Sequence, residues 1–239
     1  MLTFHSDPAK KQARIDRAKR HVEQDRLMSG TYNDGNGHGC SVGCDAMDID
    51  PENSENPHAI VSGYDGTPEW LEHLRDVIFE GLPSDNRAGW HVALAEAIPV
   101  GVDIAPVRHR LAAWILSADG PMTEGINHET VRESIETIRQ MHERAGRGEE
   151  TIESAAWSAA KSAAGSAARS AGYSVRSAAY TAACSAACSA AWSAESAALS
   201  AGYSVRSDAY SAACFAGSAE SAAFIRIADK VLELLRAAT

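Results

Sequence analysis

Apolar residues recur at three- and four-residue spacing through much of the first 150 positions, which predicts amphipathic helices. The clearest segment begins at Thr67-Pro68 and ends at Gly81-Leu82-Pro83, where a helix-starting proline and a glycine-proline stop flank the apolar face. That face comprises Trp70, Leu71, Leu74, Ile78 and Phe79.

Other helices are expected from the cap signal Asp7-Pro8 towards Gly30, and over residues of about 86–98, 106–117 and 127–145, the last with Asn127 as its cap. Between the first and second helices, a loop rich in Gly, Asn and Asp is followed by an acidic stretch without periodicity. Alternation typical of a strand is suggested only by HAIVSGY. Residues 1–150 are therefore predicted to form a compact, all-α domain.

From residue 151 the pattern changes, because single larger residues punctuate triplets of Ser and Ala. Between Trp157 and Phe224 the mean spacing is about 3.7 residues, close to the α-helical period. Alanine is the best helix former, so we expect long Ala/Ser-rich helices. A second region over 151–239 follows, with an amphipathic C-terminal helix as its cap.

Part of this tail is an internal repeat. Residues 170–184 read SAGYSVRSAAYTAAC, and residues 200–214 repeat them with two changes. Gly172 and Gly202 hold the same place in each copy and are candidate breakpoints, so one rod and stacked hairpins both stay open. Small Ser and Ala side chains permit close helix approach, which predicts a homo-oligomer.

Composition narrows the function classes. The formal net charge of −10 argues against nucleic acid as a partner. Neither a secretory signal nor an apolar run of ~18 residues is present, so we expect a cytoplasmic protein without a membrane partner. Five cysteines, an odd number, argue against a disulfide scaffold.

The candidate chemistry lies in GNGHGCSVGC, residues 35–44, here named the Gly/Cys loop. Two thiols and an imidazole could supply three zinc ligands, with a fourth from a later histidine. The candidate metal ligands are His38, Cys40, Cys44 and His58. As a ligand-binding loop, it would use Gly37, His38, Gly39, Cys40, Gly43 and Cys44.

Two other interpretations of this loop stay open. In the first, Cys40 is a nucleophile, activated by backbone N–H groups and by His38 as base, with Cys44 as a resolving thiol. In the second, the segment is a glycine-rich turn with two small buried cysteines. The acidic residues that follow fail the calcium-loop spacing and are expected to be solvated.

With these motifs in view, the chain resembles an uncharacterised family of proteins met in phage and prophage genomes. The likeness lies in GHGCSVGC, PEWLEHLRDVIFEGLP, GVDIAPVRHRLAAWIL and the Ser/Ala tail. Relatives tend to have Lys before Gly-Cys and Thr-x-His after the second Cys, whereas this chain has His38 and Asp45-Ala46-Met47. The resemblance implies a mobile-element setting and no mechanism.

Two functions are expected to compete. The first is a non-enzymatic phage-type accessory protein that self-associates through its Ser/Ala helices and presents the Gly/Cys loop to a host protein or small ligand, with counter-defence in the host bacterium as one setting. The second is a cysteine- or zinc-dependent enzyme centred on Cys40, for which cysteine alkylation and metal analysis discriminate.

Overall fold

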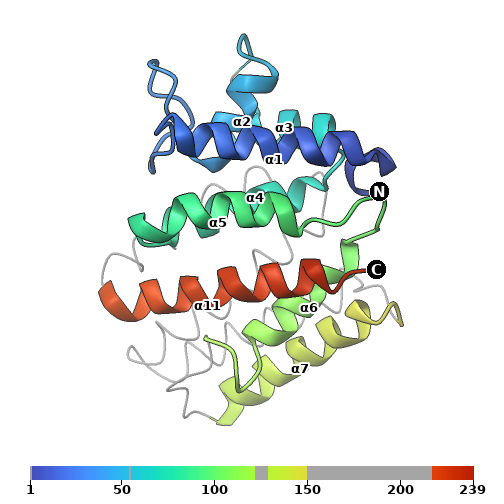
Figure 1. Ribbon diagram of the computed structural model, residues 1–239. Helices are drawn as coiled ribbons and strands as arrows, with labels where there is room; N and C mark the ends of the chain where they lie inside the picture. Colours follow the sequence, from blue (N-terminus) through green and yellow to red (C-terminus); the bar gives the residue numbers. More distant parts are fainter. Residues whose placement is uncertain (1, 54, 122–128, 150–216) are drawn as a thin grey trace. The chain divides into compact units, whose positions relative to one another are not determined.

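The computed structural model describes residues 2–53, 55–121, 129–149 and 217–239, which include helices and an isolated bridge between Leu27 and Gly39 but no strand. The predicted all-α class is thereby confirmed for the described part of the chain (Figure 1). Both copies of the repeat, and the expected cap at Asn127, lie outside the described residues. Among those that are described, no helix combines the length and the apolar character needed to cross a membrane.

The chain divides into two compact units. Unit 1 comprises residues 1–105 and 221–239, and unit 2 comprises residues 106–220. The sequence assigned the C-terminal helix to the tail as its cap, whereas this division joins it to the N-terminal helices. The reason is its apolar face, on which Val231 and Leu235 are almost fully buried.

Among its described residues, unit 1 contains a short 3-10 helix, five complete α-helices and most of a sixth. In chain order these are the 3-10 helix Thr3–Ser6, α1 (Pro8–Glu23), α2 (Ser41–Ile49), α3 (Pro57–Asp65), α4 (Glu69–Gly81), α5 (Ser84–Ala97) and α11 (Gly217–Arg236).

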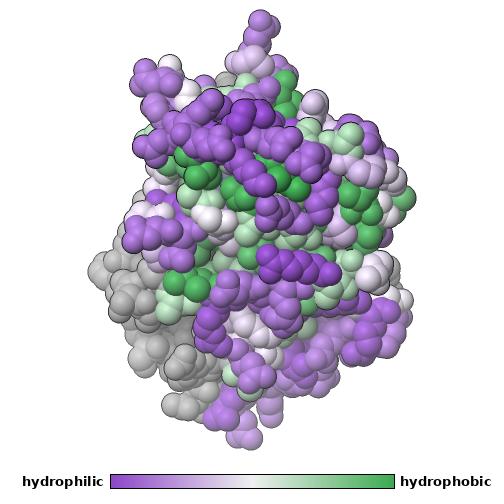
Figure 2. Space-filling view, in the orientation of Figure 1, coloured by the Kyte–Doolittle hydropathy of each residue, from purple (hydrophilic) through white to green (hydrophobic). Residues whose placement is uncertain are grey.

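Helix α1 begins as its sequence predicts. The Asp7 carboxylate accepts a hydrogen bond from Ala9 N at 2.8 Å, which satisfies one of the backbone N–H groups that the first turn leaves free. Ile15 and Ala18 pack against Ala95 of α5. Hydrophilic side chains cover the outer face of α1 (Figure 2), so this helix is amphipathic despite its few apolar residues.

Two helices differ from the sequence expectation. Helix α2 occupies the end of the predicted loop and the start of the acidic stretch, and α3 forms from the HAIVSGY segment. Asn56 caps α3 through Ala59 N at 3.2 Å, Pro57 takes its first position, and Gly66 ends it with a φ of +68°. These local end signals outweigh the apparent alternation.

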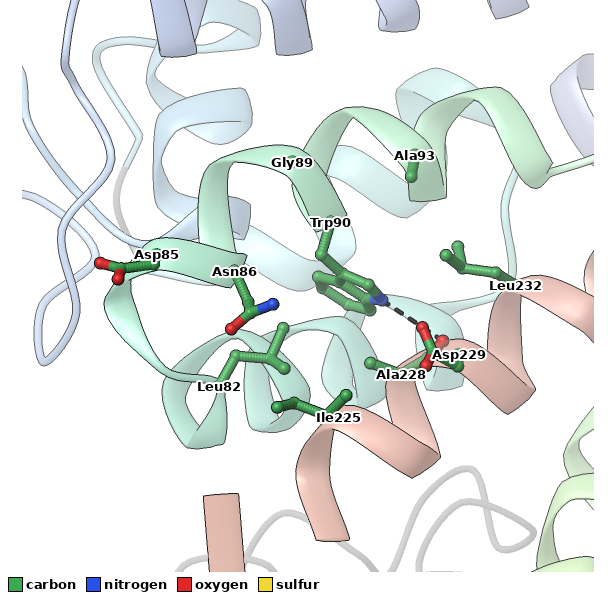
Figure 3. A pocket seen from close by; sticks show the side chains of 10 residues that line it. All are labelled: Leu82, Asp85, Asn86, Gly89, Trp90, Ala93, Ile225, Ala228, Asp229 and Leu232. Atoms are coloured by element: carbon green, nitrogen blue, oxygen red, sulfur yellow. Dashed lines mark hydrogen bonds between the residues drawn. The ribbon is translucent and has the colours of Figure 1, made fainter. Parts of the chain in front are cut away.

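The apolar face predicted for α4 is confirmed, because all five of its residues are buried. Helix α11 lies against α4 and α5: a Cβ atom added at Gly81 would meet the Phe224 ring at 2.4 Å, and Trp90 Nε1 donates to Ala228 O at 3.5 Å. Around that hydrogen bond, α5 and α11 line a groove of about 280 Å³ (Figure 3).

In unit 2, the described helices are α6 (Ala105–Ile115) and α7 (Glu129–Gly146). The Nδ1 atoms of His109 and His142 lie 3.0 Å apart and join the two helices. Burial lowers the pKa of His109 to about 4 and that of His142 to about 3, so both rings are neutral at pH 7. Ile138 and Met141 of α7 are buried.

Candidate functional site

The Gly/Cys loop is anchored at its base by backbone contacts. Met28 N donates to Gly39 O at 2.9 Å, and Gly39 N donates to Arg26 O at 3.0 Å. Added Cβ atoms at Gly39 and Gly43 would lie 2.1 and 2.0 Å from Tyr32 O. The glycines are therefore required because Tyr32 backbone passes directly over them.

The exposed tip of this region, residues 33–38, is held by its own side chains. Asp34 Oδ1 accepts hydrogen bonds from Asn36 N at 2.8 Å and from His38 N at 3.0 Å, and Asp34 Oδ2 lies 3.0 Å from His38 Nδ1. Asn33 Oδ1 accepts from Gly35 N at 2.8 Å. The hydrogen bonds to Asp34 hold the pKa of its carboxyl group well below the ordinary value, and the backbone N–H groups of Asn36 and His38 have the largest effect. The tip is therefore preorganised.

Both cysteines of the loop point into the protein. Cys40 is the N-cap of α2: its Sγ accepts from Gly43 N at 3.4 Å and donates to Asp76 Oδ1 at 3.2 Å. Cys44 Sγ donates to Gly39 O at 3.4 Å. Burial, and for Cys40 also the Asp76 charge, raises the pKa of each thiol, that of Cys44 to about 11. At pH 7 both are buried thiols rather than thiolates.

The predicted site residues therefore separate into three places. His38 pairs with Asp34 on the exposed tip, and Cys44 contacts backbone carbonyls. Cys40 and His58 are brought together by Asp76, whose carboxylate lies 3.5 Å from His58 Nε2. No contact joins Cys40 to His38 as thiol and base among the described residues.

Asp76 is the centre of a cluster that the sequence did not predict. Tyr32 Oη donates to Asp76 Oδ2 at 2.8 Å, and the His58 ring stacks on His73 at 3.9 Å between centroids. Burial alone would raise the pKa of Asp76, but His58 and Tyr32 beside it hold that pKa below the ordinary value. Ligand atoms of Cys40, Asp76 and Glu80 all lie within 4.8 Å of one another.

A second buried cluster lies beside the first and joins α1, α2, α3 and α4. Its three arginines and three carboxylates alternate around a closed ring, with N···O distances of 2.8, 3.0, 2.6, 3.0, 2.7 and 3.2 Å. In ring order the residues are Arg14, Glu72, Arg75, Asp45, Arg17 and Asp65, here named the charge ring.

The charge ring has equal numbers of positive and negative groups and is buried. Burial would raise the pKa of Glu72 and of Asp45, but the adjoining arginines lower the first to about 2 and the second well below its ordinary value. For Asp65 burial dominates, so its pKa is raised, and its Oδ1 atom has no hydrogen-bond partner among the described residues. Buried charges of this kind are tolerated because each faces an opposite charge.

A chain of hydrogen bonds leads from the charge ring to the surface. Arg75 Nε donates to Ser41 Oγ, and Arg75 Nη2 lies 3.3 Å from His91 Nδ1. Because a guanidinium can only donate, His91 Nδ1 is an acceptor and also accepts from the Ser41 hydroxyl at 2.8 Å. His91 Nε2 then donates to His21 Nδ1 at 3.2 Å, and His21 Nε2 donates to Asp48 Oδ2 at 3.1 Å. This order requires neutral histidines, in agreement with the pKa of both being lowered by burial. Ser41 is fully buried, so the chain supports the fold rather than attack on a substrate.

Neither the family models, nor the characterised proteins, nor the solved structures with which the chain was compared match it. The structure presents a rigid polar tip to solvent, above two buried polar clusters. One of these, the charge ring, balances its charges, and the other, around Asp76, gathers metal-ligand groups.

Proposed function

We propose that the chain is a non-enzymatic, phage-type accessory protein that binds a host protein through the loop tip, residues 33–38. One observation carries the proposal: the tip is exposed and is fixed by hydrogen bonds to Asp34, while the reactive groups of the Gly/Cys loop face inward. A preordered loop loses little conformational entropy on binding, which favours recognition.

The same observation speaks against the enzymatic alternative in its nucleophilic form. A nucleophilic cysteine needs an accessible thiolate with a lowered pKa and a base within hydrogen-bond reach. Cys40 is 1% exposed, its pKa is raised, and its thiol donates to a carboxylate. His38, the expected base, is occupied by Asp34.

A protein partner suits the tip better than a small ligand does. The groove described in unit 1 lies between α5 and α11, and none of its lining residues belongs to the loop. Small ligands bind in concave sites, whereas protruding loops recognise other macromolecules. The resemblance to phage proteins adds the setting in which such a partner would be a bacterial protein, with counter-defence as the purpose.

Self-association through the Ser/Ala tail is the second part of the proposal. Its support is the duplicated segment of the sequence, in which small residues surround a repeated stripe of Tyr and Arg. Several copies of one loop on a single assembly would raise its effective affinity for a multivalent target.

The loop is tested by comparing three immobilised full-length chains in a lysate of the host bacterium. Asp34→Ala removes the carboxylate that orders the tip, and Asp16→Ala makes the same chemical change on exposed α1. We expect a bacterial protein, identified by mass spectrometry, to be retained by the wild type and by Asp16→Ala and lost from Asp34→Ala. Equal retention by all three chains contradicts the proposal.

A further inference from the structure

The cluster around Asp76 places a thiol, two carboxylates and a buried histidine nitrogen near one another, whereas the charge ring holds only arginines and carboxylates. His58 is 6% exposed, and its Nε2 atom makes no hydrogen bond with any described residue. The nearest carboxylate oxygen recorded for it is Asp76 Oδ2, at 3.5 Å. A buried imidazole nitrogen without a partner is costly, so a group that it can bind would stabilise the fold.

We infer that unit 1 binds one Zn²⁺ ion at this cluster, through side chains that α2, α3 and α4 bring together. The proposed ligands are Cys40 Sγ, His58 Nε2 and one carboxylate oxygen each of Asp76 and Glu80. The inference is independent of the proposed function, because none of these residues belongs to the loop tip.

The placement of the ligands follows from the helices. Asp76 and Glu80 are four residues apart on α4 and therefore lie on one face. Cys40 is the N-cap of α2, and His58 is in the first turn of α3, so both are fixed at helix starts. Zinc bonds of ~2.0–2.3 Å in a tetrahedron place ligand atoms roughly 3.3–3.8 Å apart. The ligand atoms of Cys40, Asp76 and Glu80 lie within 4.8 Å of one another, and His58 Nε2 lies 3.5 Å from Asp76 Oδ2, so the four side chains must draw together when the ion binds.

The donor set selects the metal. A thiolate and an imidazole favour zinc over magnesium or calcium, which take oxygen ligands, and two carboxylates complete four coordination. Glu80 is oriented by Gly30 N, which donates to both of its oxygens at 3.1 and 2.9 Å, and Tyr32 orients Asp76. Such outer contacts are typical of ligands held ready for a metal.

Binding releases one proton. In the metal-free cluster the Cys40 thiol proton is donated to Asp76 Oδ1. When zinc binds, the S–H bond breaks, a sulfur–zinc bond forms, and the proton leaves to solvent, which frees the Asp76 oxygen for the metal. The Gly43 N–H that points at Cys40 Sγ, at the N-terminus of α2, stabilises the resulting thiolate. The apparent affinity therefore rises with pH.

Cobalt(II) serves as the spectroscopic probe, because a thiolate ligand gives a charge-transfer band. The parent is the full chain with the three tail cysteines replaced by serine (Cys184, Cys188 and Cys214), so the band reports the Gly/Cys loop alone. We expect one Co²⁺ per chain, displaced by equimolar Zn²⁺. Cys40→Ser abolishes the band, and Cys44→Ser, the matched control, keeps it.

Two results overturn the inference: the parent shows no band, or the band is removed by Cys44→Ser and kept by Cys40→Ser. Because Cys40 is buried, a variant that does not depend on it is also needed. Glu80→Gln at half-buried Glu80 should raise the Zn²⁺ dissociation constant about tenfold or more. An unchanged constant contradicts the proposed ligand set.

Discussion

Arg75→Met breaks the charge ring at two adjacent junctions. Arg75 is 2% exposed and contacts Glu72 at 3.0 Å and Asp45 at 2.6 Å, and methionine fills a similar length without a charge. Glu72 then keeps only Arg14, and Asp45 keeps only Arg17, so the ring carries one uncompensated negative charge. Removing one partner of a buried ion pair costs about 3–5 kcal/mol, a large part of the ~5–15 kcal/mol of a typical domain.

The assay is urea unfolding of the full chain at pH 7, followed by circular dichroism. The control is Lys19→Ala, because Lys19 pairs with Glu96 at 3.4 Å while both side chains are half exposed. Exposed pairs contribute about 0–1 kcal/mol, so we expect the control to unfold near the wild-type midpoint. If Arg75→Met lowers the free energy of unfolding as little as Lys19→Ala does, the reasoning is refuted.

The pH dependence separates charge from packing. The wild-type pKa of Glu72 is about 2 and that of Asp45 is well below its ordinary value, whereas in the unfolded chain both lie near ~4. Glu72 and Asp45 therefore contribute stability above pH ~4 that is lost as the pH falls through their folded pKa values, whereas Asp65, whose pKa is raised, does not. In Arg75→Met both pKa values rise towards those of the unfolded chain. The difference in free energy of unfolding between wild type and variant should therefore shrink as the pH falls below ~5. A deficit independent of pH would indicate lost packing alone.

Three further results are expected. Because His91 is buried and neutral, the free energy of unfolding should fall as the pH drops below ~6.5, the pKa of histidine in the unfolded chain. Urea titrations at several pH values should show a smaller fall in this free energy for His91→Gln than for the wild type. An equal dependence on pH in both chains counts against the hydrogen-bonded chain through His91. Gly43→Ala forces a Cβ atom against Tyr32 O and should lower the free energy of unfolding by about 1–3 kcal/mol. Gly63→Ala, which has open space within α3, should raise that free energy by up to about 1 kcal/mol. Similar denaturation midpoints for the two variants contradict this expectation. Iodoacetamide labelling of Cys40, read by peptide mass spectrometry, should be on the order of a hundredfold slower in the native chain than in urea, and rapid native labelling would revive the nucleophile.

The helices that the sequence predicts well are those whose signals are local. Asp7-Pro8 specifies the start of α1, and the apolar stripe between Pro68 and Gly81 specifies α4. For the segment of α2 the sequence predicts a loop, because that segment is glycine-rich and acidic. It is stabilised instead by contacts that are distant in sequence, since Asp45 binds Arg17 of α1 and Arg75 of α4.

The candidate site follows the same rule. The sequence singled out Cys40 and His58 as ligand types, and the structure brings them close to Asp76. Asp76 and Glu80 were overlooked because a carboxylate pair on an amphipathic helix is ordinarily solvated. Their spacing of four was visible, but which face of α4 meets Cys40 depends on tertiary packing. His38 lies close in sequence to the cysteines, but its side chain pairs with Asp34, four residues before it, on the exposed side of the loop.

The claim that the chain acts as an assembly of loop-bearing modules is tested most directly by its mass in solution. Light scattering after size exclusion, on the reduced full chain, should give a fixed multiple of 25.3 kDa across a wide concentration range. A variant with Tyr173, Tyr180, Tyr203 and Tyr210 replaced by serine should fall to the single-chain mass. A wild-type chain that elutes at 25.3 kDa at every concentration would contradict the account.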